Sequence, residues 1–261
     1  MNLEIIDNGN SFDFGKTSLD YASYRDIYPN SFYNKLYNFG IGIEGQEILD
    51  LGTGTGVIPR NLTRFNARFV GTDISEAQIE QARVLSKKQG SSIEYITASA
   101  EEIDFDDNSF DIIMACQCWW YFDKSIILPK INRMLKDKGK LVVMYMNWLP
   151  FEDEIAKATE ELVLKYNPNW TGCNFRRHKL SVPEWSTELF DAETLHTYTE
   201  RIHFSIEGWM GRIRACRGIG ASLPNEAVKE FDKEHYMLLK EIINDTLSIL
   251  HQIWIEIFVP K

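Results

Sequence analysis

A glycine-rich turn carries the clearest chemical signal in this sequence. Residues 48–56 read Ile-Leu-Asp-Leu-Gly-Thr-Gly-Thr-Gly, so an apolar strand ends in Asp50 and runs into three closely spaced glycines. Glycine accepts positive φ angles and lets the backbone approach a ligand closely. Asp73 ends the next apolar stretch, where a carboxylate can accept hydrogen bonds from both hydroxyls of a ribose. The pattern predicts a site for an adenosine-containing ligand.

Two other nucleotide sites fit the spacing less well. A dinucleotide fingerprint requires glycine or alanine at position 57, where this chain has Val57. Residues 15–17, Gly-Lys-Thr, resemble the end of a phosphate-binding loop, but Asn10 replaces the required glycine and no strand precedes it. A turn with a purely structural role is the remaining alternative.

Two aromatic clusters could lie beside such a ligand. Tyr21, Tyr24, Arg25 and Tyr28 fall at i, i+3, i+4 and i+7, which places them on one face of a helix. Residues 119–122 read Trp-Trp-Tyr-Phe and follow the fourth expected strand. Aromatic faces attract cations, so this cluster suits a cationic ligand. Packing against the core is the alternative for both clusters.

Three arginines further along the chain could bind an anionic substrate. Arg212, Arg214 and Arg217 lie in a stretch that we expect to be helical. A guanidinium group pairs with carboxylate or phosphate through two hydrogen bonds, whereas the alternative is a solvated helix face. Residues 176–179, Arg-Arg-His-Lys, are expected to form an exposed loop. The histidines and cysteines lack metal-ligand spacing, so we expect no metal site.

The composition argues against several classes of function. The 261 residues carry 28 Lys and Arg against 38 Asp and Glu, and the net charge of −10 disfavours nucleic acid as a partner. The longest apolar run, residues 141–146, is far shorter than the roughly 18 residues of a membrane span. No secretory leader is evident, and the four cysteines do not resemble a disulfide framework. We therefore expect a cytoplasmic protein with reduced thiols and no membrane partner.

A regular alternation of strand and helix patterns positions these residues. Such alternation indicates βαβ units, hence an α/β fold with a doubly wound, mostly parallel sheet. Helices are also expected at 17–28 and 31–39, and capping boxes begin at Thr17 and Ser75. The first five expected strands are 47–51, 67–72, 93–97, 110–116 and 140–146, with helices at 56–65, 75–88 and 125–135.

The pattern changes after Pro150. A helix is expected at 152–166, an irregular segment at 167–194, and strands at 195–205 and 251–259. We expect these last two of seven strands to pair antiparallel, with a helical cap of about 206–250 inserted between them. The predicted parts are an N-terminal helical segment at 1–45 with a loose leader at 1–16, a Rossmann-like core at 46–150, and the last strands with their cap at 151–261.

The glycine-rich turn together with Asp73 resembles the cofactor loop of class I S-adenosylmethionine-dependent methyltransferases, and residues 99–111 continue the resemblance. Residues 21–29, 115–123 and 206–217 resemble the small-molecule branch that includes trans-aconitate methyltransferase-like proteins. The resemblance implies S-adenosylmethionine as the cofactor and S-adenosylhomocysteine as its product. It also implies that the N-terminal segment closes over the cofactor.

The resemblance assigns roles to individual residues. Asp73 would bind the ribose, Ser99 and Ala100 the adenine, and Arg25 the methionyl carboxylate while a tyrosine shields the sulfonium. The full set expected at the cofactor is Tyr21, Arg25, Asp50, Gly52, Thr53, Gly54, Gly56, Asp73, Ile74, Ser99, Ala100, Glu101, Cys116 and Gln117. The set expected at the substrate is Trp120, Tyr121, Arg212, Arg214 and Arg217.

Methyl transfer is an in-line displacement, so alignment and exclusion of water are its main requirements. Relatives often carry His-Trp where this chain has Trp120-Tyr121, which leaves Tyr121 and His178 as the candidates for a catalytic base. We expect a monomer or homodimer that methylates a small molecule without a metal. The alternatives are a methyltransferase of RNA or protein, and a catalytically silent protein that binds S-adenosylmethionine or S-adenosylhomocysteine.

Overall fold

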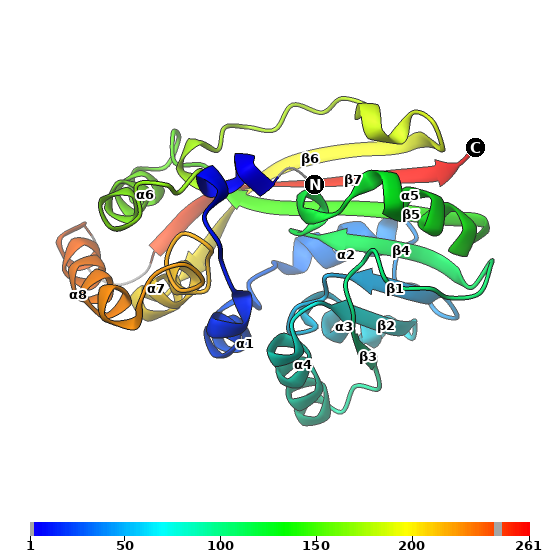
Figure 1. The fold of residues 1–261 in the computed structure, drawn as a ribbon, viewed down its shortest axis with the longest axis horizontal. Coiled ribbons are helices and arrows are strands. Elements are labelled where there is room, and N and C mark those ends of the chain that lie inside the picture. Colours follow the sequence, from blue (N-terminus) through cyan, green and yellow to red (C-terminus); the bar gives the residue numbers. More distant parts are fainter. Residues whose placement is uncertain (1–2, 243–246) are drawn as a thin grey trace.

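A computed structural model describes residues 3–242 and 247–261, which form one seven-stranded sheet with helices on both faces (Figure 1). The strands are β1 (Glu47–Leu51), β2 (Arg68–Asp73), β3 (Glu94–Thr97), β4 (Phe110–Cys116), β5 (Leu135–Trp148), β6 (Phe190–Phe204) and β7 (Leu247–Pro260). The α-helices are α1 (Ser18–Tyr24), α2 (Asn30–Asn38), α3 (Val57–Leu62), α4 (Glu76–Gln89), α5 (Lys124–Met134), α6 (Glu154–Tyr166), α7 (Ile206–Arg214) and α8 (Asn225–Ile242). The 3-10 helices are η1 (Leu3–Gly9), η2 (Phe14–Thr17), η3 (Thr63–Phe65), η4 (Trp119–Tyr121), η5 (Gly172–Asn174) and η6 (Glu184–Ser186).

The strand order is β3-β2-β1-β4-β5-β7-β6. Strands β1 to β5 pair parallel, whereas β7 pairs antiparallel with both β5 and β6. The chain order reverses between β1 and β4, and this switch point is where open α/β sheets bind ligands. The predicted sheet, with its antiparallel last strand and inserted cap, is confirmed.

Two apolar cores cover the two faces of the sheet. Ile48 and Leu49 are neighbours on β1, and they belong to opposite cores because successive strand residues point to opposite faces. Phe32 on α2 packs in the first core and Ile131 on α5 packs in the second. Burial on both faces explains why the central strands read as continuous apolar runs.

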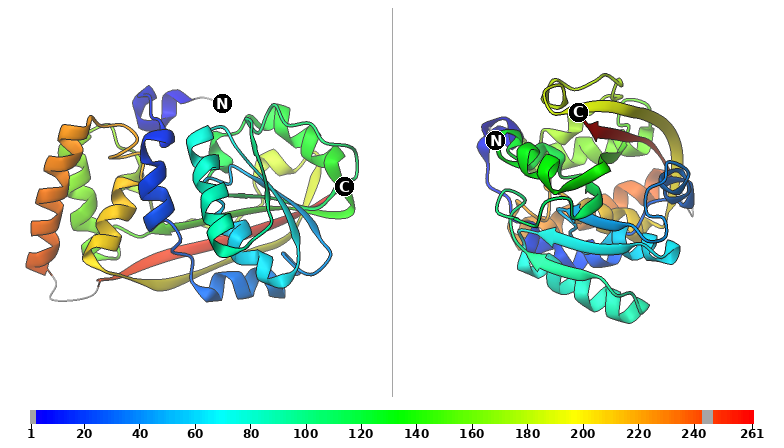
Figure 2. Two further views of the ribbon diagram at one scale, coloured as in Figure 1. Left: turned by 90° about the horizontal axis from the view of Figure 1, so that it is seen from below. Right: turned by 90° about the vertical axis from the view of Figure 1, so that its right-hand side faces the viewer.

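The cap lies beyond the ends of the long strands. Helices α6, α7 and α8 gather at one end of the sheet, and α1 lies between this group and α4 of the core (Figures 1 and 2). Within the described residues, no helix is long and apolar enough to cross a membrane.

The strands that flank the cap are longer than their pattern suggested. β6 begins at Phe190 rather than at 195, and β7 begins at Leu247 rather than at 251. Residues 247–250 alternate between buried and half-buried, so the strand period already starts where we expected the cap to continue. The predicted helical segment therefore ends at Ile242, and the expectation for residues 243–246 lies outside the described residues.

The two predicted capping boxes are wrong. Thr17 precedes α1 without a capping side-chain bond, since its hydroxyl donates to the carbonyl of Phe14 at 3.1 Å. Ser75 likewise makes no capping bond to α4. A capping side chain is present at another helix: the carboxylate of Asp153 accepts hydrogen bonds from the first backbone amides of α6.

Candidate functional site

The glycine-rich loop turns from β1 into α3 through three residues with positive φ: Gly52 at 63°, Gly54 at 56° and Gly56 at 72°. A side chain at Gly52 would meet the Sγ atom of Cys118 at 2.7 Å. At Gly54 a Cβ atom would meet Gln78 and Tyr21 at 3.9 Å, an ordinary van der Waals contact, so the positive φ rather than crowding favours glycine there. The loop therefore presents bare backbone at the carboxyl end of β1, as a closely bound ligand requires.

Gly56 has a different part in the turn. A Cβ atom there would lie 2.1 Å from the hydroxyl of Tyr95 on β3. Gly56 lines neither of the two cavities described below. Its small size admits Tyr95 to the space behind the loop, and the structure gives it no contact with the expected cofactor space.

Asp73 ends β2 beside this loop. Its two oxygens accept backbone hydrogen bonds from Gly54 and Ser75, each at 2.9 Å. Burial raises the pKa of Asp73, while these two bonds act in the opposite direction. A carboxylate oxygen can accept more than one hydrogen bond, so each still has capacity for a ligand hydroxyl.

Asp50 supports the loop from below. It is 2% exposed, and its carboxyl group accepts a hydrogen bond from the hydroxyl of Thr53 at 2.6 Å. Burial raises the pKa of Asp50 to about 7. The backbone amide of Thr53 donates to the carbonyl of Thr72 at 2.8 Å, which ties the turn to β2.

A first cavity of about 780 Å³ lies over the loop. Its walls contain thirteen of the fourteen residues expected at the cofactor, all but Gly56. They are Tyr21, Arg25, Asp50, Gly52, Thr53, Gly54, Asp73, Ile74, Ser99, Ala100, Glu101, Cys116 and Gln117. Residues from the first strand ends, the N-terminal helix and the segment after β4 thus meet around one space.

Gln117 follows β4 in a left-handed conformation, with φ of 66°. Its backbone amide donates to the carbonyl of Met144 at 2.9 Å, and its side-chain amide donates to the carbonyl of Met146. Left-handed φ is unfavourable for residues other than glycine, and such strain is concentrated at functional sites. The neighbouring Cys116 Sγ lies 3.3 Å from the hydroxyl of Tyr28.

A second cavity of about 870 Å³ adjoins the first. Six residues line both cavities: Phe14, Tyr21, Arg25, Gln117, Tyr121 and Phe122. The second cavity is otherwise walled by aromatic groups that include Trp120, Trp148, Trp170 and Phe175. The shared wall places the contents of one cavity next to those of the other.

The aromatic segment after β4 forms part of this wall. Trp120 stacks on Tyr145 of β5 with ring centroids 4.7 Å apart. The hydroxyl of Tyr121 accepts a hydrogen bond from Nη1 of Arg217 at 2.6 Å. Burial raises the pKa of Tyr121 despite this arginine, so its phenol stays protonated near neutral pH and is unsuited to act as a base.

His178, the other expected base, lines neither cavity. Its Nε2 lies 3.0 Å from a carboxylate oxygen of Glu256, and its ring stacks on Trp254 at 4.8 Å. The side chain of Gln252 bonds to both its backbone amide and its carbonyl. These contacts hold His178 against β7, away from the space where a base would be needed.

The three expected substrate arginines separate in space. Arg212 and Arg217 line the second cavity, but Arg214 lines neither cavity. Arg214 pairs with Asp20 on α1 and with Asp232 on α8, each at 3.0 Å. Arg214 therefore joins α7 to its neighbours, and the structure contradicts its expected contact with substrate.

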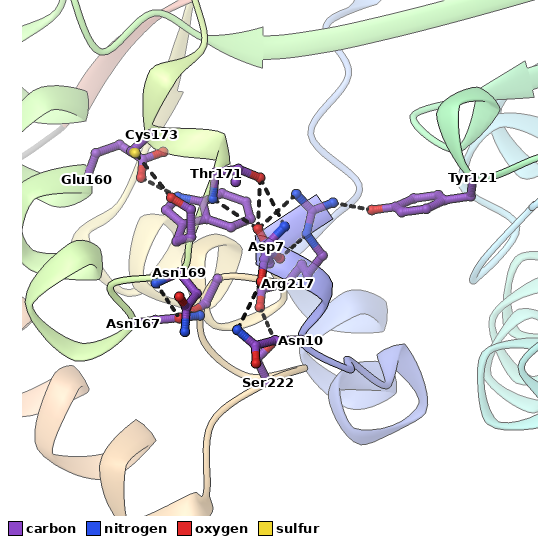
Figure 3. Close-up of polar contacts among 12 residues, drawn as sticks. Asp7, Asn10, Tyr121, Glu160, Asn167, Asn169, Thr171, Cys173, Arg217 and Ser222 are labelled. Carbon is purple, nitrogen blue, oxygen red and sulfur yellow. Dashed lines mark hydrogen bonds and ion pairs between the residues drawn. The ribbon is translucent and has the colours of Figure 1, made fainter. Parts of the chain in front are cut away.

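The N-terminal leader, expected to be loose, is fastened across the site. Asp7 is 2% exposed and pairs with Arg217. The same carboxylate accepts hydrogen bonds from the amide and hydroxyl of Thr171, each at 2.9 Å. Figure 3 shows Arg217 reaching Asp7 on one side and Tyr121 on the other. We call the contacts among Asp7, Thr171 and Arg217 the latch.

The leader also supplies cavity walls that sequence reasoning missed. Phe12 and Asp13 line the first cavity, and Phe14 lines both. The signal was the pair of phenylalanines within an otherwise polar segment. Lys124 was also missed: it lines the second cavity, and its Nζ donates to the carbonyls of Trp119 and Phe122 at 2.5 and 2.7 Å. Burial lowers the pKa of Lys124 to about 8.

Comparison with known proteins agrees with this geometry. A family described as a methyltransferase domain matches residues 49–143. A ubiquinone biosynthesis O-methyltransferase from Bradyrhizobium diazoefficiens is 33% identical over 130 residues, which cover 49% of this chain and 50% of that protein. A protein of the same name from Chelativorans sp. is 33% identical over 129 residues, or 49% and 51% of the two chains. The chain spans about half the length of these curated relatives.

Solved structures share the fold. A candidate methyltransferase from Bacillus halodurans superposes with a TM-score of 0.53 at 20% identity, covering 87% of this chain and 98% of that one. A candidate type II methyltransferase from Anaeromyxobacter dehalogenans gives 0.54 at 17% identity, covering 88% and 96%. Residues 49–143 thus match a methyltransferase domain, and the chain has the fold of solved methyltransferase structures, in agreement with the resemblance of the glycine-rich turn.

Proposed function

We propose that this protein transfers a methyl group from S-adenosylmethionine to a small-molecule acceptor. The observation that carries the proposal is the pair of adjoining cavities. The first is lined by the glycine-rich loop and Asp73, and the second shares Tyr21, Arg25 and Gln117 with it. A donor in the first cavity would therefore lie beside an acceptor in the second.

The residues of the first cavity suit the donor. Gly54 leaves room for close backbone approach, and Asp73 can accept hydrogen bonds from ribose hydroxyls. Ser99 and Ala100, to which the family resemblance assigns the adenine, line this cavity. Arg25 lies over the ring of Tyr21 at 4.5 Å and, within the described residues, has no carboxylate partner, which suits it to the methionyl carboxylate.

S-adenosylmethionine supplies a methyl group already activated by a positively charged sulfur. The chain then has to align the acceptor with that group and keep water out. The latch holds the leader over both cavities, and Trp120 and Tyr121 wall the acceptor space. Because the pKa of Tyr121 is raised by burial, we propose an acceptor that is nucleophilic without help from this residue.

The choice of a small acceptor rests on the relatives named for ubiquinone biosynthesis and on the size of the second cavity, about 870 Å³. The net charge of −10 counts against RNA. The matched family segment ends at residue 143, whereas Trp170, Arg212 and Arg217 of the second cavity lie beyond it. We therefore do not assign the acceptor of these relatives to this chain.

Calorimetric titration with S-adenosylhomocysteine tests the donor site. The wild-type protein should bind it and should bind little NAD. Asp73→Ala should lose roughly 1.5–3 kcal/mol of binding free energy, because a charged acceptor of hydrogen bonds is removed. Glu44→Ala, a change of an exposed carboxylate, is the control. Equal affinity in wild type and Asp73→Ala would refute the role of Asp73.

Activity needs a separate measurement. Incubation with labelled S-adenosylmethionine and a metabolite extract should yield a labelled small product. Binding of S-adenosylhomocysteine without any labelled product would favour a catalytically silent binding protein instead.

A further inference from the structure

We propose that the second cavity binds an acceptor that bears a carboxylate group, and that Arg212 holds this carboxylate. The assignment of the cavity to the acceptor rests on the function proposed above. The charge that the cavity recognises rests on the contacts of Arg212 itself.

Arg212 is a buried cation with an unused hydrogen-bonding edge. It lies on α7, is 3% exposed, and lines the second cavity but not the first. Its Nη1 donates to Sγ of Cys216 at 2.9 Å, and its guanidinium lies over the ring of Trp148 at 4.8 Å. Its buried Nε has no hydrogen-bond partner in the described part of the chain.

The unused edge has the geometry of a carboxylate fork. The Nε–H and one Nη2–H bond of a guanidinium point in parallel, which suits the two oxygens of one carboxylate. An unpaired buried charge is costly, and a bound ion is one way in which such a group is satisfied. Burial lowers the pKa of Arg212, and the neighbouring Arg25 acts in the same direction, so an anion would relieve both effects.

Glu160, an acidic group that interacts electrostatically with Arg212, already has other hydrogen-bond partners. Glu160 on α6 is 3% exposed and accepts hydrogen bonds from the indole nitrogens of Trp148 and Trp170, at 2.7 and 2.6 Å. Burial raises the pKa of Glu160 to about 7, which halves its charge near neutral pH. Glu160 thus orients two walls of the cavity and leaves the fork of Arg212 open.

The rest of the cavity favours the same ligand. Its walls carry five cationic side chains, Arg25, Lys124, Arg176, Arg212 and Arg217, and one carboxylate, Asp123, which caps α5. The aromatic walls suit a flat apolar body. A phosphate carries a charge of about −1.5 to −2 near neutral pH and would require a second uncommitted cation beside Arg212. Arg217 is committed to Asp7, and the proposed function assigns Arg25 to the methionyl carboxylate of the donor, so a monocarboxylate fits best.

Matched ligand pairs test the proposal. Benzoate, trans-cinnamate and 2-naphthoate are titrated into the protein saturated with S-adenosylhomocysteine, beside their neutral amides and phenyl phosphate. At least one acid should bind about 10-fold or more tightly than its amide, because a charge-assisted pair is lost in the amide. Arg212→Met should abolish this preference, and Arg214→Met, on the same helix but outside the cavity, should keep it.

The outcomes separate the two proposals. Failure of S-adenosylhomocysteine to bind would overturn the proposed function. Normal binding of S-adenosylhomocysteine with no acid preferred over its amide, or with phenyl phosphate preferred over every acid, would overturn the carboxylate site alone. A preference that survives in Arg212→Met would assign it to another cation and overturn the role of Arg212.

Thermal unfolding without ligand gives a second measurement. Removing an unpaired buried charge from a ligand site should raise the melting temperature, whereas removing a structural pair should lower it. Arg212→Met is therefore expected to melt at a higher temperature than wild type, and Arg214→Met at a lower one. A lower melting temperature for Arg212→Met would count against the proposal.

Discussion

The latch fastens the leader to the rest of the molecule. We expect Asp7→Ala to break the latch and so to release the leader. Asp7 binds Arg217 and accepts two hydrogen bonds from Thr171, so one carboxylate joins segments that lie far apart in the sequence. The substitution removes all of these contacts and leaves Arg217 with the hydroxyl of Tyr121. We expect the leader to open locally while the core stays folded.

The cost follows from burial. Breaking a buried ion pair by removing one partner costs about 3–5 kcal/mol. The side chain of Arg217 is 11% exposed and retains one hydrogen bond, so the lower figure applies. A loss of about 3 kcal/mol raises the open population roughly a hundredfold. The global stability should change less, because the leader is a terminal segment.

Hydrogen exchange measures this opening directly. The amide of Asp13 donates to the carbonyl of Ala221 at 2.9 Å, so its exchange reports whether the leader is bound to the cap. It should exchange roughly a hundredfold faster in Asp7→Ala. Affinity for S-adenosylhomocysteine should also fall, since Asp13 lines the first cavity.

A surface aspartate serves as the control. Asp104 pairs with Arg133, but the two side chains are 74% and 38% exposed, so Asp104→Ala should change neither measurement. Unchanged exchange at Asp13 together with a large drop in the melting temperature of Asp7→Ala would refute the reasoning. Asp7 would then belong to the cooperative core rather than to a separable leader.

Two further substitutions test the loop and the acceptor wall. Burial raises the pKa of Asp50 to about 7, so this group favours folding below pH 4 and loses that contribution as the pH rises through 7. Asp50→Asn should therefore flatten the fall in unfolding free energy between pH 4 and 7 by roughly 1 kcal/mol per pH unit, as measured by urea unfolding; an unchanged slope would contradict this. Trp120→Phe should keep most of the methyl-transfer rate, because the stack on Tyr145 survives, whereas Trp120→Ala should lose about tenfold or more through misalignment. Equal rates in these two variants would show that the ring does not align the acceptor.

The first cavity could be predicted because its signals are local. A strand, a glycine turn and an acid at the end of the next strand are separated by short, regular intervals, and the sheet order brings them together. Gly56 shows the limit even here. Its spacing is indistinguishable from that of Gly52 and Gly54, yet it packs against Tyr95 from another strand. Only the three-dimensional structure reveals that partner.

The errors arose where a distant contact outweighs a local pattern. The leader has the composition of a loose segment, but one buried aspartate fastens it to residues 171 and 217. β7 begins early because its residues 247–250 pair with residues 201–204 of β6. None of these partners is adjacent in the sequence.

The three arginines in and just after α7 show how distant contacts give identical side chains different roles. The sequence alone does not distinguish Arg212, Arg214 and Arg217, and each could bind an anion. Asp20 and Asp232 neutralise Arg214, and Asp7 neutralises Arg217. Two of these acids, Asp7 and Asp20, come from the N-terminal segment. The segment that closes over the donor cavity therefore also pairs with Arg214 and Arg217. The fork of Arg212 is thereby left as the anion site of the second cavity, and its specificity depends on acids about two hundred residues away in the chain.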